Sequence, residues 1–70
     1  MSKRTTGVVR WFDGSRGYGY IEAESGERVF VHHTAICSPE APLLREGEHV
    51  AFVLEQTVQG LQASEVTRLS

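Results

Sequence analysis

Two short runs of alternating residues constrain the fold of this chain most strongly. The first is Arg16-Gly17-Tyr18-Gly19-Tyr20-Ile21 and the second is Val29-Phe30-Val31-His32-His33. Successive side chains of a strand point to opposite faces, so each run, read as a strand, gathers its rings on one face. Ile21 points away from the tyrosines, and Val29 and Val31 point away from Phe30. Each strand therefore has an aliphatic side suited to a core and an aromatic side.

The rest of the chain repeats this pattern of short apolar runs separated by turn residues, which predicts an all-β fold. We expect five strands, at Thr6–Phe12, Tyr18–Ala23, Arg28–His32, His49–Glu55 and Gln62–Arg68. The segment Thr34–Gly47 contains two prolines and is expected to be mostly irregular, with a short helical turn after His33. Because closure removes exposed sheet edges, five strands in a single domain of residues 1–70 favour a small barrel.

The inward-facing positions of these strands predict the core. Its expected members are Val9, Ile21, Val29, Val31, Ile36, Leu44, Val50, Phe52, Leu54 and Val66, with Val8 at the margin. Strict alternation from Val9 would also turn Trp11 inward. A turn follows Trp11 closely and a strand end can twist, so we do not expect Trp11 to keep that register.

The net charge of −2 is unevenly distributed along the chain. Residues 1–33 hold five basic and four acidic side chains, whereas residues 34–70 hold two basic and five acidic ones. The cations therefore lie in the same half as the aromatic runs, where a local field acts on a ligand more than the global charge does. With so few cations, we expect modest affinity for nucleic acid that falls as salt rises.

Several other classes of protein are disfavoured by the sequence. The single cysteine, Cys37, excludes an internal disulfide framework and suits a reducing cytoplasm. No segment approaches the roughly 18 apolar residues of a membrane span, and the N-terminus does not resemble a signal peptide. His32, His33 and Cys37 lack the paired spacing of zinc modules, and no orienting group suggests a thiol enzyme. We therefore expect no metal, no other cofactor and no catalysis.

The basic-Gly-aromatic-Gly-aromatic run fits an RNA-recognition motif, but that fold needs two helices and a second aromatic motif upstream. The whole arrangement instead resembles the bacterial cold-shock proteins. The segments that carry the resemblance are Gly7-Val8-Val9-Arg10-Trp11-Phe12, Arg16–Ile21, Val29-Phe30-Val31-His32, Ala35-Ile36, Glu46-Gly47, Val50-Ala51-Phe52 and Val66-Thr67. Their order and spacing run from Gly7 to Thr67 without an insertion.

This resemblance implies an OB-fold, a five-stranded antiparallel barrel that binds single-stranded RNA or DNA and acts as a passive RNA chaperone or a regulator of transcription or translation. Trp11, Tyr18, Phe30 and His33 would be the main stacking platforms. By position, the binding surface would comprise Arg10, Trp11, Phe12, Arg16, Tyr18, Tyr20, Phe30, His32 and His33.

Departures from the family pattern predict weaker binding than is usual for it. Tyr18 and Tyr20 stand where phenylalanine is usual, and they keep the stacking surface. His33 also replaces a phenylalanine, Ala41 replaces an aromatic residue of the long loop, and Asp13 replaces a common asparagine. The last hairpin is expected to be looser because a leucine follows Gly60 where proline is usual.

Two alternatives remain open from the sequence. The aromatic side could instead dock a partner protein, in which case binding would not weaken steeply with salt. A monomer is expected, although a barrel with an open edge strand can also dimerise or exchange strands across the long loop.

Overall fold

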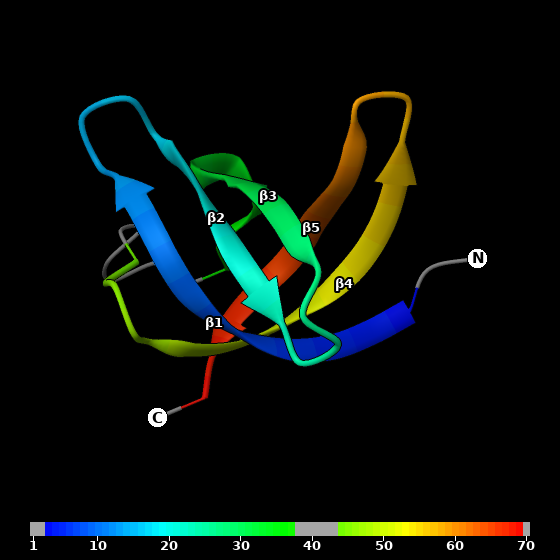
Figure 1. Cartoon of the computed structure of the whole chain (residues 1–70). Coiled ribbons are helices and arrows are strands. Elements are labelled where there is room, and N and C mark those ends of the chain that lie inside the picture. The colour runs from blue at the N-terminus through cyan, green and yellow to red at the C-terminus, as the bar shows by residue number, and fades with distance from the viewer. Residues whose placement is uncertain (1–2, 38–43, 70) are drawn as a thin grey trace.

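The computed structural model describes residues 3–37 and 44–69, which form five strands and one short helical turn (Figure 1). The turn η1 follows β3 directly, at the place where the sequence suggested one. Each expected strand segment lies within a strand of the structure, and the first, fourth and fifth strands extend beyond the expected bounds. The elements are β1 (Lys3–Asp13), β2 (Tyr18–Ala23), β3 (Arg28–His32), η1 (His33–Ala35), β4 (His49–Thr57) and β5 (Gly60–Arg68).

The strands form a closed barrel in the order β1-β2-β3-β5-β4, which confirms the predicted all-β barrel. All neighbouring strands are antiparallel except β3 and β5, which pair in parallel through Phe30 and Gln62. The predicted barrel was to be antiparallel throughout, and the structure differs from that prediction in the one β3–β5 pair. Strand directions cannot alternate around a closed ring with an odd number of members, so one neighbouring pair must be parallel.

Strand β1 is long because it serves two neighbours. Its first part, Lys3–Val8, pairs with β4, and its second part, Gly7–Asp13, pairs with β2. Figure 1 shows this strand curving along the barrel from the edge of β4 to the β1–β2 hairpin. The strand that carries Trp11 is thus also the strand that joins the two ends of the β-sheet.

The barrel interior is filled by aliphatic side chains and one phenylalanine. Eight of the expected core residues are buried, while Ile36 and Leu54 are partly buried against them and Val8 is half-buried. The small residues Ala23, Ala51 and Ala63 are also buried and were not anticipated. The fully enclosed side chains are Val9, Ile21, Val29, Val31, Val50, Phe52 and Val66.

A β-bulge at Arg10 resolves the position of Trp11. Val9 pairs with Ile21, but the next pair is Trp11 with Tyr20, so Arg10 is an extra residue without a partner in this ladder. An extra residue shifts the alternation by one position. Val9 is therefore buried, whereas Arg10 and Trp11 are both exposed, and Phe12 turns back to pack against the core.

Gly19 lies opposite Phe12 and permits the close approach of β1 and β2 beyond the bulge. A Cβ atom at this position would lie 2.6 Å from the Phe12 Cα atom and still closer to the Trp11 carbonyl oxygen. Only a residue without a side chain fits here.

Among the described residues, no helix is long and apolar enough to cross a membrane.

Candidate nucleic-acid interface

The outward-facing rings lie in two neighbouring rows across β1, β2 and β3. Trp11 pairs with Tyr20 and Tyr20 pairs with Phe30, while Tyr18 pairs with His32 in the next row. Directly paired residues project from the same face of a sheet, so these five side chains share the outer face of the barrel. We call Trp11, Tyr18, Tyr20, Phe30 and His32 the aromatic face.

Three of these rings form a continuous series. The ring centroids of Trp11 and Tyr18 are 5.7 Å apart with an interplanar angle of 60°, and those of Tyr18 and Phe30 are 5.9 Å apart at 30°. Trp11 is 42% exposed and Phe30 is 39% exposed, although apolar groups of this size are usually buried. The barrel core fills the opposite side of the same strands, so these rings are available to a ligand.

His33 extends this surface from η1. Its backbone N–H donates to the Gly17 carbonyl at 2.8 Å, and its imidazole lies 4.5 Å from that of His32 between ring centroids. Gly17 has a φ of +79°, and a Cβ atom there would lie 2.5 Å from the His33 Cδ2 atom. The glycine before Tyr18 thus lets the His33 ring settle beside the aromatic face.

Phe12 is the predicted surface residue that the fold places elsewhere. It is half-buried and packs against the core cluster, because the bulge reverses the alternation of β1 after Arg10. Its part in binding stays a prediction.

Ala41 lies outside the described residues. Leu61 is half-buried and packs against the core.

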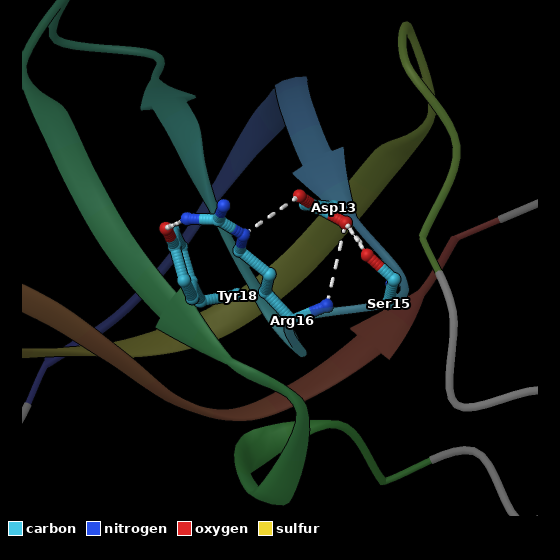
Figure 2. Close-up of polar contacts among 4 residues, drawn as sticks. All are labelled: Asp13, Ser15, Arg16 and Tyr18. Carbon is cyan, nitrogen blue, oxygen red and sulfur yellow. Dashed lines mark hydrogen bonds and ion pairs between the residues drawn. The ribbon is translucent and has the colours of Figure 1, made fainter.

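Arg16 lies at the edge of the aromatic face, between a carboxylate and a ring hydroxyl (Figure 2). Its Nε atom is 3.8 Å from Asp13 Oδ2, and its Nη1 atom donates to the Tyr18 hydroxyl at 3.5 Å. Asp13 also accepts hydrogen bonds from the Ser15 hydroxyl at 2.7 Å and from the Ser15 backbone N–H at 3.0 Å. The turn after β1 therefore fixes the carboxylate that holds Arg16.

These contacts shift the pKa values of both partners. The hydrogen bond from the Ser15 hydroxyl is the largest of the effects that keep the pKa of the Asp13 carboxyl below its ordinary value. Desolvation is the next largest effect and opposes it, while backbone N–H groups and the Arg16 charge each lower the pKa by less. The pKa of Arg16 is raised, chiefly by its hydrogen bond to Tyr18. Both side chains are therefore ionised around neutral pH.

Replacing Asp13 by asparagine is expected to remove one acid-sensitive contribution to stability. Since the pKa of Asp13 is lowered in the folded state, its contribution is present above the unfolded pKa and is lost as pH falls through the folded value. Asparagine keeps the Oδ1 acceptor for Ser15 but cannot titrate. The difference in melting temperature between wild type and Asp13→Asn should shrink as pH falls from about 5 through the ordinary aspartate pKa of about 3.9 and below it. A difference that is constant over this range would contradict the assignment.

Two further arginines flank the row of Trp11, Tyr20 and Phe30. The Nε atom of Arg10 lies 3.2 Å from Glu22 Oε1, and the guanidinium of Arg28 lies 4.7 Å from the centroid of the Tyr20 ring. Sequence reasoning left Arg28 out of the site. The signal that would have included it is the pairing of Glu22 with Arg28, two positions along the strands from Tyr20 and Phe30 and therefore on the same face.

Comparisons with known proteins agree with one another. The model of the 'Cold-shock' DNA-binding domain family matches residues 5–69. The cold shock protein CapB of Pseudomonas syringae pv. tomato is 44% identical over 66 residues, covering 94% of this chain and 96% of the relative. The cold shock-like protein CspD of Bacillus cereus is 46% identical over 63 residues, covering 90% of this chain and 96% of the relative.

Solved structures share the fold at lower sequence identity. A structure of Drosophila Unr CSD456 has a TM-score of 0.80 at 23% identity, covering 97% of this chain and 27% of that one. Apo-CusF from Escherichia coli has a TM-score of 0.67 at 16% identity, covering 100% of this chain and 89% of that one. At these identities, the likeness concerns the barrel alone.

Proposed function

This chain belongs to the cold-shock DNA-binding domain family, and from that premise we propose that it binds single-stranded RNA and DNA by stacking unpaired bases on the aromatic face. The observation that carries the proposal is the continuous series of Trp11, Tyr18 and Phe30 rings on the outside of a well-filled barrel, with Trp11 and Phe30 exposed and Tyr18 half-buried between them. Each base stacked on an aromatic side chain contributes about 1–3 kcal/mol, and every base offers a suitable ring face.

The proposed mechanism is passive. Bases in a duplex already stack on their neighbours, so only an unpaired strand can offer its bases to the aromatic face. Binding therefore favours the unpaired state by mass action and melts weak secondary structure without a nucleotide cofactor or a catalytic step. Regulation of transcription or translation would follow from exposing or covering such segments.

The proposed binding surface combines the rings with neighbouring polar groups. Tyr20 and His32 lie on the aromatic face, His33 lies beside it, and Arg10 and Arg16 flank it. Phe12 would support the surface from the core side of the sheet, where it packs against Gly19. We propose that the chain binds as a monomer. In support, the described strands close on themselves and leave no strand of the barrel without two neighbours.

Fluorescence of Trp11 tests the function directly, since it is the single tryptophan of the chain. Titration with an unstructured pyrimidine-rich oligonucleotide at low salt is expected to quench its emission as a base stacks on the indole. The same sequence annealed to its complement is the control and should quench far less. Equal quenching by the duplex, or none by the single strand, would overturn the proposal, and the second result would favour an aromatic face that docks a protein.

A further inference from the structure

The arginines around the aromatic face differ in the groups that already contact their guanidinium. Arg10 is ion-paired with Glu22, and Arg16 lies between Asp13 and the Tyr18 hydroxyl. Figure 2 shows the Arg16 guanidinium directed at both of these groups. Arg28 has neither kind of partner: no carboxylate in residues 3–37 or 44–69 pairs with it, and no group there accepts a hydrogen bond from its side chain.

The position of Arg28 on Tyr20 leaves its binding groups free. A guanidinium that lies over a ring uses its flat face, while its N–H groups point outward in the plane of the guanidinium. Those N–H groups form the fork that matches two oxygens of a phosphate. The ring also holds the side chain in one place, which reduces the conformational entropy lost when a ligand binds.

The surroundings of Arg28 provide space for such a ligand. A depression of about 240 Å³ lies among Arg10, Tyr20, Glu22, Gly26 and Arg28. Glu22 would repel an anion there, but Arg10 already offsets its charge at 3.2 Å. The three charged side chains together leave one positive charge, and it resides on Arg28.

We propose that Arg28 is the principal phosphate-binding residue of the aromatic face, whereas Arg10 and Arg16 contribute less because their carboxylate partners compete with the phosphate. The inference rests on the proposed function and specifies which part of the strand's backbone is held. A strand whose bases stack on the series of Trp11, Tyr18 and Phe30 would bring a phosphate to Arg28, which begins β3 and lies over the ring of Tyr20.

The salt dependence of binding tests this inference. Each phosphate neutralised on a single strand contributes about 0.7 to the slope of log K against log salt. Arg28→Gln is expected to lower the magnitude of that slope by about 0.7, so that its loss of affinity is about 2.5-fold greater at 50 mM than at 200 mM salt. Arg10→Gln and Arg16→Gln are each expected to lower it by less than half as much.

Arg4→Gln is the matched control, because it removes one exposed arginine on the part of β1 that pairs with β4. It should leave the magnitude of the slope nearly unchanged. Glu22→Gln should increase that magnitude, because Arg10 loses its carboxylate partner and can bind a phosphate. An Arg28→Gln slope equal to that of wild type, or equal losses for all three arginines of the site, would overturn the inference while the proposed function stands. Absence of binding by the wild-type chain would instead count against the proposed function.

Discussion

Replacing both Tyr18 and Phe30 by alanine is expected to weaken the binding of a pyrimidine-rich oligonucleotide by about 30-fold. Each lost stacking surface costs about 1–3 kcal/mol, and 2 kcal/mol corresponds to that factor in the dissociation constant. The two rings are 5.9 Å apart and support each other, so their losses need not add. Titration monitored by Trp11 fluorescence measures the effect, with each single variant placed alongside the double variant.

The control for this experiment is Val58→Ala, which removes a fully exposed apolar side chain from the β4–β5 hairpin. It changes the apolar surface of the molecule without touching the aromatic face, and its affinity should equal that of wild type. Circular dichroism should show that the double variant is still folded, because Phe30 is exposed and Tyr18 is only half-buried. A folded double variant that binds as tightly as wild type would remove the stacking mechanism.

Gly19→Ala is expected to have the largest effect on stability, at about 3 kcal/mol or more. The added Cβ atom would meet the backbone of Trp11 and Phe12, which cannot rotate away as the end of a flexible side chain could. Strands β1 and β2 would have to separate beside the bulge. For a domain of this size, such a loss lowers the melting temperature by roughly 12–24 °C, as thermal unfolding followed by circular dichroism would measure.

Gly26→Ala separates steric clash from backbone strain. Gly26 has a φ of +93°, but nothing lies within 4 Å of the Cβ atom that alanine would add. Its cost should therefore be that of the left-handed conformation alone, about 1–2 kcal/mol. If Gly19→Ala costs no more than Gly26→Ala, the close approach of β1 and β2 does not limit stability.

Much of the barrel follows from alternation along the sequence, because an aliphatic face must be buried and a period of two leaves little freedom in β2 and β3. The residues Ile21, Val29 and Val31 lie in the core for this reason. The parallel contact between β3 and β5 is different in kind. It follows from the closure of five strands into a ring, which local sequence periodicity does not describe.

The candidate site was less predictable where it depends on register and on pairing between strands. Periodicity within β1 places Trp11 inside, and only the extra residue at Arg10 brings it outside and sends Phe12 inward. Likewise, the sequence predicted Arg10 as part of the binding surface and left Arg28 out, although it is Arg28 that lies over a ring of the aromatic face. Their difference arises across the strand pairs, because β2 presents Glu22 to Arg10 on one side and the Tyr20 ring to Arg28 on the other.

Because of the bulge at Arg10, the alternation of inward and outward side chains in the first part of β1 does not determine the alternation in the second part. Before the bulge Val9 is buried, in a part of β1 that pairs with β4 and β2, and after it Phe12 turns to the core, where β1 pairs with β2 alone. Substitutions that tune which rings meet a ligand can therefore accumulate beyond residue 10 without disturbing the half that closes the barrel. Loss of the extra residue at the bulge, by contrast, would leave Val9, Trp11 and Phe12 in regular alternation, so that Trp11 stays outside and Phe12 inside while the local kink of β1 disappears.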